Sequence, residues 1–403
     1  MKRILSLLLV LSLLLPVLSL AEEDEDDDFS VEEIVEDVML DDDGNEILMD
    51  EDTGEKIILS SADQDSLDKL DEAWGLQQTE EIDPADLELN QNLPDHIINI
   101  LLIGLDVKGT KENKLLTQQE KYAKRADVQM VCSIDLDDGS VKLTSIARNT
   151  YVEIPGRKDT LVANSYGHAN YDANGKYKSW TDTPENCVRT VNHNFELNIQ
   201  YYIAINFYGV VQIIEALGGS DIDLTKVEAR AINSYLAKNR REISKTYDDK
   251  QGKRDKLKVT AGVQHLDGLQ SLMYARLRSI DSDFVRTGRT RHLLDCVLKS
   301  TVSRIRNHEL NVVDLLEQFI DYPVTNITPS TLVSLANSVV NSELTSNLDD
   351  ASSMISEFRV PSDGNWFYDT VNGSSVTKFK DKQADVEAIH EFIYGRYYPS
   401  VGE

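Results

Sequence analysis

The chain has 403 residues, of which 41% are apolar and 28% are charged, and its formal net charge is −29. This composition can bury a sizeable core and predicts one large domain with additional segments. The charge is concentrated in one part: residues 22–95 hold 30 acidic residues and two lysines, whereas residues 96–403 hold 40 acidic and 37 basic residues. Because that second part is nearly neutral and has no basic stripe interleaved with aromatic residues, we expect no nucleic-acid partner.

The N-terminus has the pattern of an export signal. Lys2 and Arg3 precede an apolar run, Ile4–Leu20, and the small residue Ala21 stands at the expected cleavage position. An uncleaved anchor is the alternative, since a run of about 17 residues is at the lower limit for crossing a bilayer. Residues 1–21 are thus expected to be a signal peptide or anchor, and the protein to be exported, either secreted or held at the outer face of the cytoplasmic membrane.

Residues 22–95 are acidic and poor in aromatic residues, which predicts a largely extended, solvated segment. A weak alternation near 45–60, folded about Asp52-Thr53-Gly54, indicates a local hairpin.

Residues 96–397 read as one α/β domain. Buried strands are expected to open at Ile97 and to occupy Val128–Leu136, Val141–Ala147, Tyr201–Asn206 and Asp221–Leu224. Helix signals start at Pro184 and cover Phe207–Leu217, Leu266–Arg276, Gly288–Ile305, Asn311–Phe319, Pro329–Val340 and Ala384–Tyr394. Strands that alternate with helices predict layered α/β architecture with a mixed sheet. The charged stretch Lys238–Lys258 lacks apolar periodicity and is either a mobile insertion or a polar helix.

Several common active sites are excluded at the level of sequence motifs. The chain has no phosphate-binding Gly-x-x-x-x-Gly-Lys loop, no Gly-x-Ser-x-Gly elbow and no His-Glu-x-x-His zinc motif. Cys132, Cys187 and Cys296 lack metal-ligand spacing, and Cys132 stands inside an apolar strand, where a buried structural role is expected.

An arginine cluster lies between Tyr274 and Arg291. It contains no lysine, and its other members are Arg276, Arg278, Arg286 and Arg289. Guanidinium groups bind phosphate oxygens in a bidentate manner and stay charged at any working pH, so the cluster suits an anionic diphosphate. The alternative is a solvated basic helix end paired with nearby aspartates, and composition alone leaves the two interpretations about even.

A second group of charged residues is expected at strand ends. Arg148 follows the third strand, Asp127 begins the second, and Asp106 ends the first. Ligands gather at strand ends in α/β sheets, and carboxylates are the hard oxygen ligands that Mg²⁺ prefers. Spacing alone favours the alternative, in which both aspartates simply end strands and make turns.

The order of seven segments along the chain favours a ligand site over the two structural alternatives. The segments GLD, RADVQM, SIARNTYVEIPG, DTLVANSYGHA, FYGVVQIIEALGGSDIDL, HLDGLQSLMYARLR and DSDFVRTGRTR together closely resemble the LytR-CpsA-Psr family, from about Ile97 to Tyr394. The resemblance implies an extracytoplasmic three-layer α-β-α domain. It also implies a phosphotransferase that moves a glycan phosphate, as of teichoic acid or capsule, from a polyprenyl-pyrophosphate carrier to peptidoglycan, with Mg²⁺ as cofactor.

Matched motif by motif, the resemblance assigns roles to seven side chains. Asp106 and Asp127 would hold the metal, Arg148, Arg276, Arg278, Arg286 and Arg289 would bind the two phosphates, and Arg148, Arg276, Arg278 and Asp127 would be catalytic. Apolar residues of Phe207–Leu217 and Leu293–Ile305 would line a prenyl tunnel, although at helical spacing such residues are more often ordinary core.

The chain also departs from the family pattern. Asn149 replaces a usual aspartate, Thr160 a usual lysine, and Thr290 and Arg291 usual glutamines. Two alternatives to the transferase therefore stay open: a polyprenyl-pyrophosphate-binding or regulatory homologue with little turnover, and a magnesium-dependent pyrophosphatase.

Overall fold

A mixed sheet of six strands organises the domain, with the order β11-β8-β1-β2-β3-β12. The computed structural model describes residues 87–105, 125–156, 158–171, 177–182, 184–239, 256–277, 323–328 and 355–400, with positions 292–293, 296–297, 331–332 and 335. The strands of this sheet are β1 (Ile97–Leu105), β2 (Ala126–Asp135), β3 (Val141–Ile146), β8 (Tyr201–Asn206), β11 (Val324–Thr325) and β12 (Ile355–Val360).

The centre of the sheet is a meander extended by parallel strands. β1 pairs antiparallel with β2, and β2 with β3, through the expected turn at Asp137–Gly139. β8 lies parallel to β1, and β12 lies parallel to β3 at the edge. Nearly every residue of β1 and β2 is buried, which agrees with their apolar sequence because both faces of the sheet are covered.

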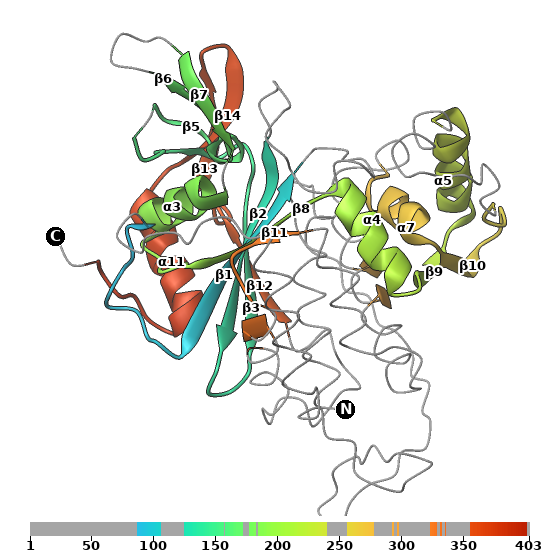
Figure 1. Cartoon of the computed structure of the whole chain (residues 1–403), viewed down its shortest axis with the longest axis horizontal. Helices are drawn as coiled ribbons and strands as arrows, with labels where there is room; N and C mark the ends of the chain where they lie inside the picture. Colours follow the sequence, from blue (N-terminus) through green and yellow to red (C-terminus); the bar gives the residue numbers. More distant parts are fainter. Residues whose placement is uncertain are drawn as a thin grey trace, which may run out of the picture.

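Helices cover both faces, so the domain has the expected three layers. α3 (Pro184–Phe195) and α11 (Lys382–Tyr394) lie on one side of the sheet, and α4 (Phe207–Ala216) and α7 (Gly268–Ala275) on the other (Figure 1). Alternate residues of β1 enter two separate cores: Ile100 and Leu102 pack with α4 and α7, while Leu101 and Ile103 pack with α3 and α11. The prediction of an α-β-α domain is confirmed.

Local sequence signals explain the helix boundaries. The Asn206 side chain accepts from the Gly209 N–H at the start of α4, and Asp267 and Gln270 form a capping box at the start of α7. α11 begins after Asp381 and ends at Gly395, whose φ of 75° is left-handed. Helix α7 starts later than the sequence indicates, because Leu266 ends strand β10 (Gly262–Leu266).

Smaller elements surround the sheet and were not expected from the sequence. They are helix α5 (Lys226–Lys238), the 3₁₀ turn η4 (Val162–Ser165), and three hairpins: β4 (Tyr151–Val152) with β5 (Thr160–Leu161), β6 (Gly167–Tyr171) with β7 (Tyr177–Asp182), and β13 (Trp366–Val371) with β14 (Ser374–Phe379). A fourth pair joins β10 to β9 (Ser220–Leu224), whose position was expected.

Residues 87–95 pack on the domain, although the sequence groups them with the acidic segment. Leu87 is 1% exposed, and the Asn90 side chain donates to the Glu196 and Tyr398 carbonyl oxygens at 3.1 and 2.9 Å. The folded region therefore begins before residue 96. The expected signal segment, the hairpin near 45–60 and the helix at Asn311–Phe319 lie outside the described residues, as do most of the helices expected at Gly288–Ile305 and Pro329–Val340 and most of the charged stretch 238–258. Within the described part, no helix combines the length and apolarity needed to cross a membrane.

Candidate functional site

The ends of three neighbouring strands lie level with one another at one end of the sheet. Leu105, the last residue of β1, is level with Asn206 at the end of β8 and with Ala126 at the start of β2. A register shift after Gly104 leaves Asp127 as the extra residue of a bulge in β2. Bulges re-aim side chains, and strand ends collect ligands in α/β domains, so this edge is a suitable position for a site.

Asp127 and Arg148 face each other at this edge. The Arg148 Nη1 lies 3.4 Å from the Asp127 Oδ2, and the two side chains are 46% and 9% exposed. Asp127 is therefore almost buried, while Arg148 contacts solvent on one side. A guanidinium held by a buried carboxylate and open to solvent is well placed to bind an incoming anion.

Backbone hydrogen bonds hold the segment that carries Arg148. The Ala147 N–H donates to the Val360 carbonyl at 2.9 Å, and the carbonyl groups of Arg148, Asn149 and Thr150 accept from Ala163, Thr377 and Val162 at 3.2, 2.9 and 2.8 Å. Four consecutive residues are thus fixed by η4, β12 and β14. Such anchoring places the guanidinium with little remaining backbone freedom.

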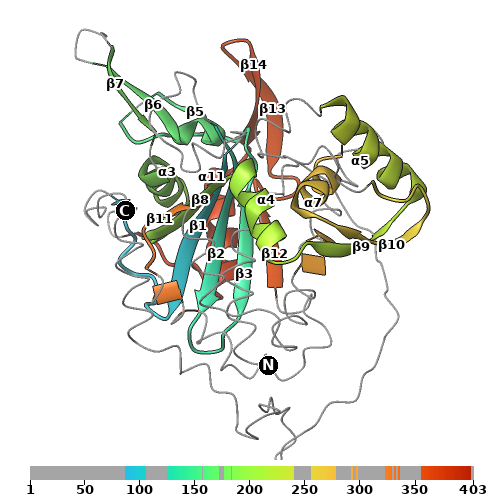
Figure 2. The same cartoon turned by 45° about the vertical axis from the view of Figure 1, so that its right-hand side comes forward.

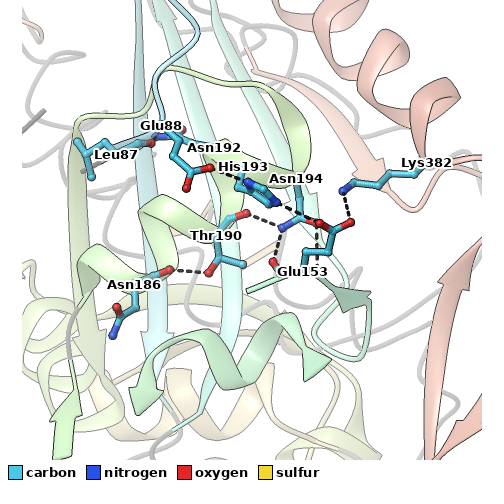
Figure 3. Close-up of polar contacts among 9 residues, drawn as sticks. All are labelled: Leu87, Glu88, Glu153, Asn186, Thr190, Asn192, His193, Asn194 and Lys382. Atoms are coloured by element: carbon cyan, nitrogen blue, oxygen red, sulfur yellow. Dashed lines mark hydrogen bonds and ion pairs between the residues drawn. The ribbon is translucent and has the colours of Figure 1, made fainter. Parts of the chain in front are cut away.

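A polar network anchors the same segment farther along the chain (Figure 3). The buried Asn194 side chain donates to the Glu153 carbonyl at 2.7 Å and accepts from the Glu153 N–H at 3.2 Å. The Glu153 carboxylate lies 3.2 Å from His193 and 3.6 Å from the Lys382 ammonium, and these contacts hold its pKa below the usual value, chiefly through the His193 hydrogen bond. His193 also contacts Glu88 at 2.6 Å, so the network joins the N-terminal entry to α3, α11 and the Arg148 segment.

Arg276, which follows α7, lies at the same end of the sheet, next to the end of β8. It caps the C-terminus of α7, and its guanidinium carbon lies 3.9 Å from the centroid of the Phe207 ring. Phe207 is 2% exposed and follows the last residue of β8 directly. The aromatic face attracts the cation and orients its plane.

Strand spacing relates the two arginines. Asn206, next to Phe207, is two strands from Ala126, next to Asp127, because β1 lies between them. Neighbouring strands are about 4.8 Å apart, so the two anchoring points are roughly 10 Å apart. Both anchoring points lie at the same end of the sheet strands.

Of the seven site residues expected from the sequence, Asp127 and Arg148 are in contact, and Arg276 lies against Phe207 at the same end of the sheet strands. A shared site for the three stays a prediction. Asp106, Arg278, Arg286 and Arg289 lie outside the described residues. Sequence reasoning missed the contact between Phe207 and Arg276, and the hydrogen bond by which Thr377 holds the Arg148 segment. Neither contact has a local signal, since each joins residues far apart in the chain.

Asn149, which stands where the family usually has an aspartate, has an unusual environment. Its side-chain Oδ1 is buried and makes no hydrogen bond to any of the described residues. A buried acceptor without a donor costs free energy, which a bound donor group would recover.

The oxygen chemistry of Asp127 fits a magnesium ligand, and the second expected ligand, Asp106, follows Leu105 at the same strand end. Within the described residues, the one group of three side chains close enough to share a metal is His96, Asp135 and Asp137, at the opposite edge of the sheet. There Asp135 accepts from the backbone N–H groups of Asp137 and Asp138, as in an ordinary turn.

Those expected prenyl-tunnel residues that the structure describes lie in the core between the sheet and the helices. Val210, Ile213 and Ile214 of α4 are fully buried and cluster with Leu293 and Val297. A lining role for them stays a prediction. Cys132 and Cys187 are also fully buried, none of the three cysteines forms a disulfide, and burial raises the pKa of the Cys132 thiol, which agrees with a structural role.

The chain is similar in sequence to curated proteins of several bacteria. A transferase of Bacillus mycoides, "Polyisoprenyl-teichoic acid--peptidoglycan teichoic acid transferase TagU", is 28% identical over 209 residues, which cover 51% of this chain and 53% of the relative. The protein of the same name from Oceanobacillus iheyensis is 28% identical over 219 residues, covering 54% and 55%. The chain therefore spans about half the length of the curated relatives it matches.

A solved structure and a family model complete the comparison. The crystal structure of protein gbs0355 from Streptococcus agalactiae matches with a TM-score of 0.50 and 19% identity, covering 76% of this chain and 90% of that one, and supports the fold. The model of the LytR_cpsA_psr family matches residues 60–387, which is most of the chain. The chain belongs to the LytR_cpsA_psr family.

Proposed function

We propose that this protein is an extracytoplasmic transferase that moves a glycan phosphate from a polyprenyl-pyrophosphate carrier to peptidoglycan. The observation that supports it most is the contact between Arg148 and Asp127 at the end of the sheet where Arg276 also lies, in a chain of this family. The names of the Bacillus mycoides and Oceanobacillus iheyensis relatives agree with this reaction. Wall teichoic acid is therefore the first donor to test.

The chemistry requires charge neutralisation more than covalent catalysis. A sugar hydroxyl of peptidoglycan would attack the glycan-bearing phosphorus, so that a new P–O bond forms as the bridging P–O bond breaks. The hydroxyl loses its proton, and polyprenyl phosphate leaves with the bond electrons. Phosphoryl transfer of this kind depends on positioning and on stabilising the charge of the phosphate oxygens.

The described residues can supply those functions. Arg148, fixed by its backbone contacts and by Asp127, would bind one phosphate, and Arg276, oriented by Phe207, would bind the other. Asp127 together with Asp106 would hold Mg²⁺, which would add positive charge at the diphosphate. Arg278, Arg286 and Arg289 would complete the anion site from the segment after α7.

A transfer assay with purified protein tests this proposal. Polyprenyl-pyrophosphate-linked glycan, peptidoglycan and Mg²⁺ should yield polyprenyl phosphate and glycan-bearing peptidoglycan, and Arg276→Ala should abolish both products. Full transfer by that variant would overturn the site assignment. A reaction that releases the glycan phosphate to water whether or not peptidoglycan is present would instead identify a pyrophosphatase.

Asn149 favours a second candidate, a homologue that binds polyprenyl pyrophosphate with little turnover. An amide cannot act as a base or carry the charge of the aspartate that the family usually has at this position. Its buried Oδ1 could instead accept a hydrogen bond from a bound ligand. Tight binding of polyprenyl pyrophosphate without transfer to peptidoglycan would support this candidate over the transferase. Recovery of transfer in Asn149→Asp would identify the amide as the cause.

A further inference from the structure

The β13–β14 hairpin lies at the rim of the candidate site. The Thr377 N–H of β14 donates to the Asn149 carbonyl, and Thr150 and Thr377 form an isolated bridge. The Lys378 ammonium lies 5.3 Å from the centroid of the Tyr151 ring, three residues after Arg148. From this attachment the hairpin extends past the end of the sheet (Figure 2). A polymer that approaches Arg148 along this edge would meet the hairpin.

The first strand of this hairpin presents aromatic side chains to solvent. β13 begins with Trp366, Phe367 and Tyr368, of which Phe367 is 43% and Tyr368 58% exposed. Alternation along the strand puts Trp366 and Tyr368 on one face, and their ring centroids are 5.0 Å apart with an interplanar angle of 71°. This edge-to-face contact orders the two rings before any partner binds.

The rest of the hairpin surface is polar and electrically neutral. Its two charged residues, Asp369 and Lys378, pair with each other at 2.8 Å. Thr370 and Ser375 are exposed opposite each other on the same face as Trp366 and Tyr368, and Asn372 and Ser374 are exposed at and beside the turn. An anionic lipid surface or nucleic acid would require unpaired basic residues, and large exposed aliphatic side chains, typical of a protein-binding patch, do not occur among residues 366–379.

Ordered aromatic rings among hydroxyl and amide groups match the chemistry of the sugar rings of a polysaccharide. A pyranose ring has an apolar face of C–H groups that can stack on an aromatic ring and a rim of hydroxyl groups that can hydrogen-bond to polar side chains. Tyr and Trp suit this dual surface because each combines an apolar ring with a polar group.

We propose that the Trp366–Tyr368 face of the β13–β14 hairpin binds a glycan strand and guides it to the Arg148 segment. The glycan strand is then the acceptor, and this role as acceptor subsite depends on the proposed transfer reaction. Binding of the glycan to the hairpin does not depend on that reaction, so the two ideas can fail separately.

The direct test measures the affinity of the full chain for soluble peptidoglycan glycan strands freed of their peptides. Tyr368→Ala should weaken binding about tenfold, which corresponds to about 1.4 kcal/mol, because it removes the ring on which the apolar face of a sugar would lie. Tyr368→Phe keeps the ring and should retain most of the affinity. Tyr235→Ala, which removes a 47% exposed tyrosine on α5, is the matched control and should bind like the unchanged protein.

Transfer kinetics separate this inference from the proposed function. Tyr368→Ala should raise KM for peptidoglycan several-fold and leave KM for the polyprenyl-pyrophosphate donor unchanged. If the unchanged protein binds glycan through Tyr368 and yet transfers nothing, the hairpin inference holds and the transferase proposal fails. If transfer occurs but Tyr368→Ala alters neither glycan affinity nor KM for peptidoglycan, or if Tyr235→Ala causes an equal loss, the hairpin inference is wrong.

Discussion

Replacing Phe207 by leucine should release Arg276 from its fixed orientation. The ring is almost fully buried and its centroid lies 3.9 Å from the guanidinium carbon, a geometry in which a partly desolvated cation–π contact is worth about 1 kcal/mol. Leucine is apolar but smaller than phenylalanine, so the substitution also carries a packing cost of about 1–2 kcal/mol, which the double-mutant cycle subtracts. The substitution therefore removes the aromatic face and retains most of the core.

A double-mutant cycle isolates that contact. Phe207→Leu, Arg276→Ala and the double variant, measured by urea unfolding, should show a coupling free energy of about 1 kcal/mol. If the ring also orients Arg276 for phosphate, Phe207→Leu should weaken binding of a polyprenyl-pyrophosphate analogue about fivefold, the equivalent of about 1 kcal/mol.

The matched control is Phe195→Leu, the same substitution at a buried ring in the opposite core, where Phe195 packs edge-to-face on Phe379. It should show no coupling to Arg276→Ala and no loss of analogue binding. Additive effects of Phe207→Leu and Arg276→Ala, to within about 0.3 kcal/mol, would refute the assigned role of the ring.

Three further predictions concern stability and its pH dependence. Gly268→Ala should lower the free energy of unfolding by about 1–3 kcal/mol, measured by urea, because a Cβ there would collide with the Val211 carbonyl oxygen where α7 meets α4; unchanged stability would contradict this close approach. Burial raises the pKa of Asp385, so its carboxyl group should destabilise the protein increasingly as pH rises above about 4. Asp385→Asn should reduce the dependence of the urea midpoint on pH between about pH 4 and 7. The same pH dependence in the variant and the unchanged protein would refute the assignment. The hydrogen bond with His193 is the chief cause of the lowered pKa of Glu153, so the carboxylate should stabilise the protein at neutral pH and lose this effect as pH falls below about 4.3. Glu153→Gln should therefore lose less stability than the unchanged protein when the pH falls below about 4.3, and its urea midpoints should keep the pH dependence that Asp385 causes.

The strands and many helix ends could be predicted from sequence because their signals are local. The apolar runs of β1 and β2, the turn at Asp137–Gly139 and the glycine after α11 each act over a few residues. Resemblance to a known family then ordered these elements into three layers.

Pairings between distant segments could not be predicted in this way. β12 joins β3 although more than 200 residues separate them, and its six residues carry no signal for that partner. The β13–β14 hairpin was missed for a different reason: the aromatic residues of β13 are exposed or half-exposed, so the strand lacks the apolar alternation of a strand that covers a core.

The candidate site shows the same division. Asp127 and Arg148 were expected to be neighbours because their strands are consecutive, and they are in contact. Arg276 was found as part of a composition anomaly and a family motif, but its contact with Phe207 depends on how α7 packs against α4, which no spacing rule specifies.

The most direct test of the central claim is single-turnover transfer from a radiolabelled polyprenyl-pyrophosphate-linked teichoic acid to peptidoglycan. The purified protein with Mg²⁺ should move label into the insoluble wall fraction and release polyprenyl phosphate in equal amount. The variants Arg148→Ala and Arg276→Ala, once thermal unfolding has shown that they are folded, should do neither. Label that stays on the lipid with the unchanged protein, or that moves equally well with both variants, would contradict the account.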